Sequence, residues 1–268
     1  MTISRTVRDH IRSNVYGLLA VFIALGGTAW AASKIGPNDI AKNAVRAKHI
    51  KNSQVTAPKL ACKGNSKQDV MVRAGAVCID KYENSIWTKK TGGSRITGTI
   101  PCNENGQDCK GKIFARSARG VPPRVNITWF QAQAALANSG KRLPSSAEWQ
   151  QAALGTPDST ACNVSSGALK NTGAEAGCVS AFGANDMVGN LWEWVADWEQ
   201  GSTCSGAWPG GYGMDAQAIC GAADGGAPRV LLRGGSFNEG TFAGPFAVNV
   251  GHPPSSLGDA VAGFRGAH

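Results

Sequence analysis

The most constraining feature of the chain is a tryptophan-rich stretch, Gly183–Trp198, which reads GANDMVGNLWEWVADW. Trp192 and Trp194 lie on one side of an alternating pattern, and Glu193 lies on the other. A period of two is the side-chain period of a β-strand, and Trp and Val favour strands. The polar segment Asn185–Asn190 contains a glycine and is typical of a turn. The stretch therefore predicts a turn that leads into a strand.

Two interpretations of this turn and strand are open. A turn rich in carboxylate and carbonyl oxygens suits a hard cation, since Ca²⁺ takes roughly six to eight oxygen ligands. Alternatively, the segment is only a tight turn into a core strand, and Glu193 pairs with an arginine. The spacing alone favours the second interpretation.

Three other stretches follow in an order and spacing that match one known family. They are Arg142-Leu143-Pro144 with Glu148-Trp149, Arg233-Gly234-Gly235-Ser236-Phe237, and Gly263-Phe264-Arg265. Together with Gly183–Trp198 they resemble the motifs of the formylglycine-generating enzyme (sulfatase-modifying factor) family over residues 62–268. The resemblance implies an α+β domain with an irregular, loop-rich, C-type-lectin-like fold and two short helices.

Residues 1–31 have the composition of an export signal. Three arginines precede an uncharged run, Ser13–Ser33, and Ala29-Trp30-Ala31 is typical of a cleavage site. We therefore predict a signal peptide and a secreted or cell-surface protein. An uncleaved anchor is the alternative, because the uncharged run is just long enough to span a bilayer. Both interpretations place the remaining residues outside the cytoplasm.

Residues 32–61 carry apolar side chains at every fifth position from Ile35 to Leu60. This period fits neither a helix nor a strand. It resembles the pentapeptide pattern of β-solenoids, but repeat units need stacked neighbours. We predict a semi-ordered basic stalk whose lysines suit an anionic cell-envelope surface. Most of the net charge of +9 lies in the leader and stalk, so the charge is no evidence for nucleic-acid binding.

The eight cysteines indicate disulfides, because an even number in an exported chain is typical of a disulfide framework. No Cys-x-x-Cys motif, which would favour a metal or redox site, occurs in the sequence. Eight cysteines allow about 105 pairings, and pairing sequence neighbours is the simplest. The predicted disulfides are Cys62–Cys78, Cys102–Cys109, Cys162–Cys178 and Cys204–Cys220.

Two helices have clear start signals. Thr128 is a capping residue for a helix over Trp129–Asn138, and Ser145–Glu148 is a capping box for a helix that ends at Gly155. The other predicted elements are a strand pair in Val70–Tyr82 that turns at Gly75-Ala76, a buried strand at Val230–Leu232, a closing strand at Val261–Arg265, and loops over Gly92–Gly111, Asp158–Phe182 and Phe237–Ala262.

The family resemblance implies an enzyme that oxidises a cysteine of a sulfatase to formylglycine with copper and O₂. Two cysteines after the Gly-Gly-Ser motif would bind the copper, because soft thiolates select Cu(I). Their places fall at Glu239 and Gly244, and no cysteine follows Cys220. Related ergothioneine-type enzymes hold iron with histidines, but no His-x-x-x-His pair occurs here. Copper is therefore not expected as a cofactor, and no catalytic residue is assigned.

The same resemblance implies two structural calcium sites, so calcium is the predicted cofactor. The first site would use the side chains of Asn163 and Glu175 with the carbonyls of Val164 and Gly177. The second would use the side chains of Asp186 and Glu193 with the carbonyls of Gly189 and Leu191. Alternatively, the Cys162–Cys178 disulfide alone holds the first set of loops.

The family's substrate groove would be lined here by Trp192, Ser236 and Phe237. The following loop adds Asn238, Phe242, Phe246 and Asn249. This segment resembles the C-terminal segment of variable proteins of diversity-generating retroelements. A concave site with aromatic walls and few polar groups is typical of a ligand pocket.

These features predict an exported ligand-binding or display module that lacks the copper-binding cysteine pair. Its partner would be a protein or a glycan. The alternative function is a divergent oxidoreductase of the formylglycine-generating type that acts on a protein cysteine.

Overall fold

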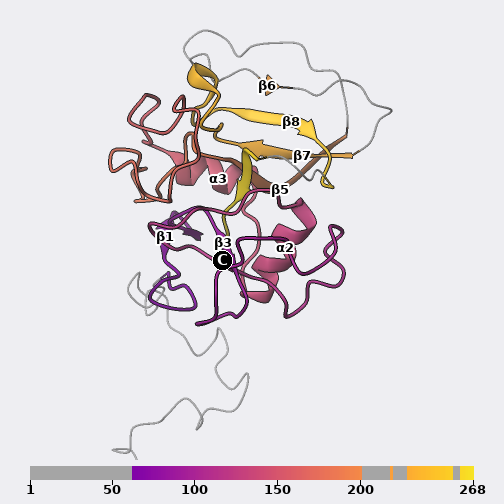
Figure 1. Ribbon diagram of the computed structural model, residues 1–268. Coiled ribbons are helices and arrows are strands. Elements are labelled where there is room, and N and C mark those ends of the chain that lie inside the picture. Colours follow the sequence, from indigo (N-terminus) through magenta and orange to yellow (C-terminus); the bar gives the residue numbers. More distant parts are fainter. Residues whose placement is uncertain (1–61, 201–217, 220–227, 256–259) are drawn as a thin grey trace, which may run out of the picture. The chain divides into compact units, whose positions relative to one another are not determined.

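A five-stranded sheet is the largest one in the part of the chain that the structure describes, with the strand order β6-β8-β7-β5-β9 (Figure 1). The strands are β5 (Trp192–Gln200), β6 (Ala218–Ile219), β7 (Pro228–Arg233), β8 (Val248–His252) and β9 (Ala262–Phe264). β7 is antiparallel to β5 and β8, whereas β9 runs parallel to β5 and β6 runs parallel to β8. The tryptophan-rich strand is thus confirmed as an inner strand of this sheet.

The computed structural model describes residues 62–200, 218–219, 228–255 and 260–268. All of them belong to one compact unit, Ala61–His268. The predicted signal peptide, the predicted stalk and the predicted Cys204–Cys220 disulfide lie outside the described residues. None of the helices in the described ranges combines the length and the hydrophobicity needed to cross a membrane.

Two small antiparallel sheets precede the main sheet. The first pairs β1 (Met71–Ala74) with β2 (Val77–Asp80), and the chain turns at Gly75, whose φ is +61°. This confirms the predicted strand pair and its turn. The second sheet pairs β3 (Ser85–Trp87) with β4 (Phe114–Arg116), which the sequence did not predict.

Both predicted helices are present with the predicted caps. Helix α2 spans Trp129–Asn138, and Thr128 accepts a hydrogen bond from the Gln131 amide. Helix α3 spans Ser146–Ala153, and Ser145 and Glu148 form the capping box. A 3-10 helix, η4 (Gly240–Phe242), follows β7. The mixture of short helices, small sheets and long loops confirms the α+β class.

The prediction of a surface loop over Phe237–Ala262 is wrong in one place, because β8 lies inside this range. β8 pairs with β7 through Leu232 opposite Asn249 and Arg233 opposite Val248. Its own sequence, VNVGH, ends in a glycine and a histidine and is a weak strand signal. The partner strand, rather than local propensity, makes this segment a strand.

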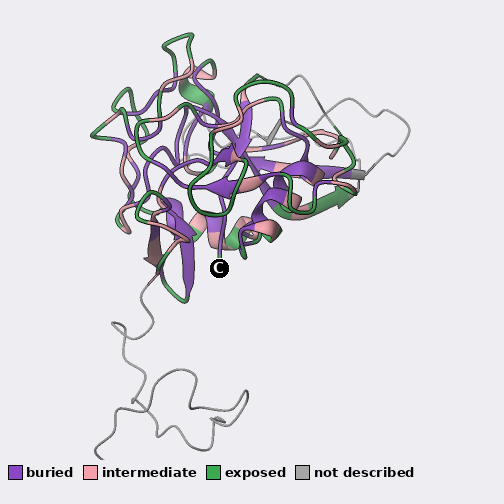
Figure 2. Cartoon of the chain, turned by 60° about the horizontal axis from the view of Figure 1, so that its bottom comes forward, coloured by how far each residue is buried: buried purple, intermediate pink, exposed green. Residues whose placement is uncertain are grey.

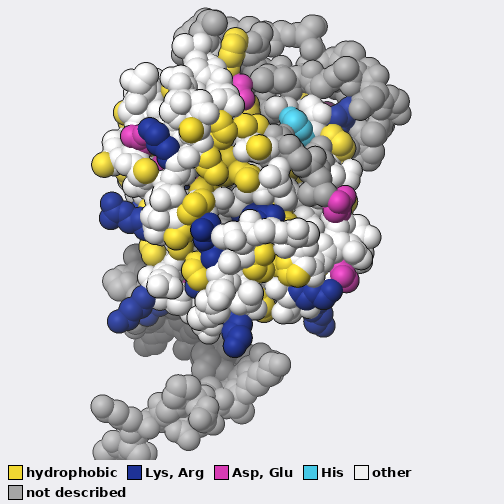
Figure 3. Space-filling view, in the orientation of Figure 1, with side chains coloured by type: hydrophobic (Ala, Val, Ile, Leu, Met, Phe, Trp, Pro, Cys, Tyr) yellow, Lys and Arg dark blue, Asp and Glu magenta, His cyan; other side chains and the backbone are white. Residues whose placement is uncertain are grey.

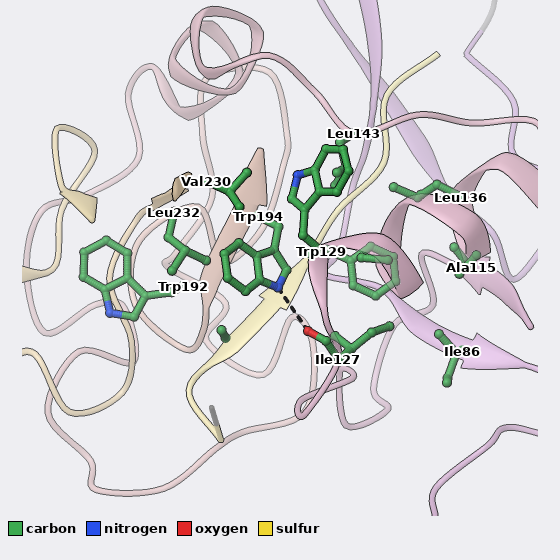
Figure 4. Packing of buried hydrophobic residues seen from close by; sticks show 14 of the residues in the cluster. Ile86, Ala115, Ile127, Trp129, Leu136, Leu143, Trp192, Trp194, Val230 and Leu232 are labelled. Atoms are coloured by element: carbon green, nitrogen blue, oxygen red, sulfur yellow. Dashed lines mark hydrogen bonds between the residues drawn. The ribbon is translucent and has the colours of Figure 1, made fainter. Parts of the chain in front are cut away.

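The two faces of β5 pack into different parts of the core. Trp192 and Trp194 belong to a cluster with residues from β3, β4 and α2, while Val195 belongs to a second cluster with Trp149 of α3. Figure 4 shows the Trp194 indole nitrogen donating to the carbonyl of Ile127, at 3.2 Å. Alternation along the strand therefore separates the two clusters, as a period of two requires.

The alternation of β5 is interrupted before Trp198. The register with β7 shifts between Trp194 and Trp198. In this interval the carbonyl of Val195 accepts a hydrogen bond from the Trp129 indole, and the amide of Ala196 donates to Pro144. As a result Trp198 is 44% exposed, although its ring packs edge-on against Trp129 at 5.1 Å.

Three of the predicted disulfides are confirmed: Cys62–Cys78, Cys102–Cys109 and Cys162–Cys178. In this order, the three disulfides close local loops of 16, 7 and 16 residues. Figure 2 shows buried residues mainly along the strands and exposed residues mainly in the loops. One face of the molecule carries a band of hydrophobic side chains bordered by Lys and Arg side chains (Figure 3).

Candidate functional site

The carboxylate of Glu239 links two of the residues predicted to line the groove. Its Oε1 accepts hydrogen bonds from the indole nitrogen of Trp192 at 3.0 Å and from the hydroxyl of Ser236 at 3.1 Å. Trp192 begins β5, Ser236 follows β7, and Glu239 precedes the 3-10 helix. Two predicted groove residues, Trp192 and Ser236, thus contact Glu239. This is the position at which the family resemblance places the first copper-binding cysteine.

The Gly-Gly motif after β7 allows the chain to pass very close to the second such position, Gly244. A Cβ on Gly235, whose φ is +85°, would lie 2.5 Å from the Cα of Ala243. A Cβ on Gly234, whose φ is +93°, would lie 2.9 Å from the Met187 carbonyl. The Gly244 amide donates to the Gly234 carbonyl at 3.1 Å. Only glycine fits at 234 and 235, because other residues are strained at these φ values and would clash.

The remaining predicted groove residues are spread over different environments. Phe237 is buried, Asn238 is exposed, and Phe242 and Phe246 are each 39% exposed. Asn249 is buried in β8, and its side-chain oxygen accepts from the Gly251 amide at 2.8 Å. Asn249 therefore supports the strand, whereas the two phenylalanines present apolar surface to solvent.

The structure adds a cavity that the sequence did not predict. It has a volume of about 290 Å³ and lies beside Gly240, the residue that follows Glu239. Four of its seven lining residues carry a hydroxyl group and one carries a carboxylate, although most of the lining surface is apolar. The lining residues are Asp158, Ser159, Thr160, Val164, Ser165, Gly240 and Thr241. The only sequence signal for it was the run Asp158-Ser159-Thr160, which lies just before Cys162.

The first predicted calcium set contains one orphaned acceptor. The side-chain oxygen of Asn163 is buried and has no hydrogen-bond partner, which fits a cation ligand. Glu175, however, forms an ion pair with Lys170. The carbonyl of Val164 accepts from the Gly240 amide at 2.7 Å, and that of Gly177 accepts from Val179. This site stays a prediction that the orphaned Asn163 oxygen supports.

The second predicted set is arranged around an arginine. Both oxygens of Glu193 accept hydrogen bonds from Arg265, and Trp149 donates to the same carboxylate at 2.7 Å. Both members of the ion pair are at most 1% exposed. The alternative interpretation, a Glu193–arginine pair, is therefore confirmed. A calcium ion at this site would therefore have to share the Glu193 carboxylate with Arg265.

Asp186, another member of the second set, also contacts Arg265. The arginine donates to the carbonyls of Asn185 at 2.9 Å and Asp186 at 3.3 Å. Asp186 has a positive φ of 56°, and its carboxylate accepts from the Gly173 amide at 2.6 Å. Burial raises the pKa of Asp186 to about 6. None of these contacts supports the second calcium site, which stays a prediction.

Among the described residues, one group of His, Cys, Asp and Glu side chains brings three ligand atoms within 4.8 Å of one another. It consists of Cys102, Asp108 and Cys109. Because Cys102 and Cys109 are joined in a disulfide, neither supplies a thiolate. This group therefore does not fit a metal ion.

Comparison with known proteins identifies one family for this chain. The sulfatase-modifying factor enzyme 1-like domain (FGE-sulfatase) matches residues 41–268. The chain belongs to this family.

Relatives of this sulfatase-modifying-factor domain include enzymes of two kinds. The formylglycine-generating enzyme of Thermomonospora curvata is 34% identical over 101 residues, which cover 28% of this chain and 33% of the relative. The hercynine oxygenase of Mycobacterium tuberculosis is 32% identical over 149 residues, which cover 49% of this chain and 33% of the relative. The matches thus span about a third of the length of these relatives.

Solved structures with a similar fold include the Major Tropism Determinant I1 variant. It is 22% identical, with a TM-score of 0.48, and the match covers 75% of this chain and 52% of that chain. The structure of CarF is 17% identical, with a TM-score of 0.42, and the match covers 75% of this chain and 93% of that chain.

In this sulfatase-modifying-factor domain, the side chains around Glu239 offer oxygen and nitrogen atoms rather than sulfur atoms. Glu239 offers a hard carboxylate where a soft thiolate would select Cu(I). The six described cysteines are all joined in disulfides. The described residues around Glu239 therefore offer hydrogen-bonding and apolar groups, but they do not present a pair of thiolates.

Proposed function

We propose that this chain is an exported ligand-binding module of the sulfatase-modifying factor family. The observation that carries the proposal is the contact of Glu239 with Trp192 and Ser236. A carboxylate takes over the central position of the groove and fixes an indole and a hydroxyl around it. This arrangement suits recognition, because the buried Trp192 and Ser236 hold the partly exposed Glu239 carboxylate in a fixed position from which it can accept from a ligand.

The surroundings of Glu239 favour a glycan as the ligand. The neighbouring cavity of about 290 Å³ is lined by the hydroxyls of Ser159, Thr160 and Thr241 among others. Phe242 lies next to Thr241 in the chain and is 39% exposed. Hydroxyl groups pair with sugar hydroxyls, and an aromatic ring offers an apolar surface to a sugar face. Export is supported by the three disulfides, which form in oxidising compartments.

The full chain, screened against glycan and peptide arrays, tests this function. We expect glycan binding that the variant Thr241→Trp abolishes, because the indole would fill the cavity. Thr91→Trp, at an exposed threonine outside the cavity lining, is the control and should bind as the wild type does. Binding that survives Thr241→Trp, or no binding on either array, contradicts the proposal.

The second candidate is an oxidoreductase of the formylglycine-generating type. It is supported by the family and by the intact groove motifs around Trp192 and Ser236. Incubating the full chain with Cu(I), O₂ and a Cys-x-Pro-x-Arg peptide separates the two functions. We expect the peptide mass to stay unchanged. Conversion of the cysteine to formylglycine would establish the enzyme instead.

A further inference from the structure

A second cavity, of about 240 Å³, lies against the edge of strand β3. Its lining includes the apolar residues Ile86, Ile96 and Leu169 and the two basic residues Arg95 and Arg124. Ile86 is fully buried in the core cluster drawn in Figure 4. The cavity thus combines a fixed apolar floor with two positive charges.

Neither arginine is neutralised by an acid among the described residues. No aspartate or glutamate lines the cavity, and no described ion pair includes Arg95 or Arg124. Their hydrogen bonds go to neutral carbonyls: Arg95 donates to Pro122 at 3.2 Å, and Arg124 donates to Gly98 at 2.9 Å. Two cationic groups at one cavity therefore lack a counter-charge from these parts of the protein.

Arg124 is the more strongly constrained of the two. Its Nε is buried without any hydrogen-bond partner, and its Nη2 takes part in no hydrogen bond within the described ranges. Burial lowers the pKa of the Arg124 guanidinium, and no acid offsets this effect. Leaving a buried donor unpaired costs stability. The Nε is closed off from solvent, so Nη2 is the nitrogen of Arg124 that is left to donate to a ligand.

The other side of Arg124 faces a neighbouring cavity of about 250 Å³, which is also lined by Glu104. The carboxylate of Glu104 would repel an anion there. The first cavity contains no acid and has the second arginine. The charges therefore direct an anionic group to the side of Arg95.

We propose that the cavity between Arg95 and Arg124 binds an organic carboxylate with a small apolar body. The carboxylate lies between the two guanidinium groups, which match its planar shape and donate charge-assisted hydrogen bonds. The apolar body packs on Ile86, Ile96 and Leu169. The cavity shares no lining residue with the Glu239 cavity, so this inference stands independently of the proposed glycan function.

Saturation-transfer NMR on the full chain with equimolar benzoate and benzamide tests the proposal. The two probes have the same ring and nearly the same shape, but only benzoate carries a charge. We expect saturation transfer to benzoate and little to benzamide, with the benzoate signal falling as salt is added, because salt screens charges. Equal transfer to both probes, or none to benzoate at millimolar concentration, overturns the proposal.

Charge-removing variants locate the binding. Arg95→Gln should weaken benzoate binding about tenfold or more, as expected for loss of a hydrogen bond between charged groups. Arg119→Gln is the matched control, because Arg119 is exposed and does not line the cavity. If both variants weaken binding equally, the effect is only the loss of net charge and the proposal fails. For Arg124→Gln, benzoate binding and the melting temperature should both be measured. Arg124 also donates a hydrogen bond to the Gly98 carbonyl, so this variant can lose stability as well as binding.

Discussion

The carboxylate of Glu193 is held by donors from two distant parts of the chain. Arg265 comes from the segment after β9, and Trp149 comes from helix α3. The pair has almost no contact with solvent, since the exposed fractions of Arg265 and Glu193 are 0% and 1%. A buried pair of this kind adds little net stability over apolar residues, but breaking it leaves a buried charge unpaired.

Glu193→Gln should therefore destabilise the protein strongly. The free energy of unfolding should fall by about 3 to 5 kcal/mol, because the buried Arg265 loses its hydrogen-bonded partner and keeps only the weaker attraction of Glu83 and Asp186. The double variant Glu193→Gln with Arg265→Met should lose much less than the sum of the two single variants. Urea unfolding of the four proteins measures the coupling.

The exposed pair of Asp108 and Lys112 is the control for this cycle. Its side chains are 39% and 46% exposed, so solvent screens their attraction. Asp108→Asn should change the unfolding midpoint very little. If Glu193→Gln is as mild as Asp108→Asn, the buried pair is not an anchor of the tryptophan strand.

The sequence predicted that Glu193 pairs with an arginine, but it did not predict which arginine. An acid within a run of core residues has to be neutralised, so pairing with an arginine was expected. Which arginine pairs with it depends on β9 lying parallel beside β5, and no local pattern reveals that. For the same reason the sequence marked Glu239 only as a missing cysteine, since its contacts with Trp192 and Ser236 exist only in the folded chain.

The elements that could be predicted from the sequence are the helices, whose ends are marked by capping residues. The bounds of α2 and the start of α3 follow from hydrogen bonds within a few residues, at Thr128 and Ser145. β3 and β4 have three residues each, which is too short for a period to be recognised. β8 was missed because its pairing with β7 overrides a weak local propensity.

The capping box of α3 gives a prediction for acid conditions. Arg142 forms a hydrogen-bonded ion pair with Glu148 and lowers the pKa of that carboxyl. A lowered pKa means that the stabilisation is present at neutral pH and is lost as pH falls through the folded-state pKa. Glu148→Gln should therefore lower the free energy of unfolding at pH 7 by up to about 1 kcal/mol. The difference from wild type should disappear in acid.

Thermal unfolding of both proteins across the acid range measures this effect. Glu104→Gln is the control, because Glu104 is exposed and forms no ion pair within the described part of the chain. It should leave the pH profile of stability unchanged. A Glu148→Gln difference that stays constant down to the lowest pH would mean that the charge of Glu148 contributes nothing to the helix.

In the molecule as a whole, disulfides constrain long segments that contain little helix or strand. Two of them close 16-residue loops, Cys62–Cys78 and Cys162–Cys178, where the chain has few helices or strands. The Cys162–Cys178 loop also carries Asn163 and Val164, which connect it to the groove. The carbonyl of Val164 accepts from the Gly240 amide at 2.7 Å, directly beside Glu239. This disulfide therefore links global stability to the shape of the candidate site.

Removing the Cys162–Cys178 disulfide should loosen the groove as well as the loop. In the chain-entropy model, which is disputed, a loop of this length contributes about 3 kcal/mol. The double variant Cys162→Ala with Cys178→Ala should lower the melting temperature, and the Gly240 amide should exchange its hydrogen faster. The matched variant, Cys102→Ala with Cys109→Ala, should also lower the melting temperature, because it opens the 7-residue loop beside α2. It should leave the exchange of Gly240 at the wild-type rate. Hydrogen exchange measured by NMR distinguishes the two, and equal acceleration in both variants would show that Glu239 is positioned without help from the Cys162–Cys178 loop.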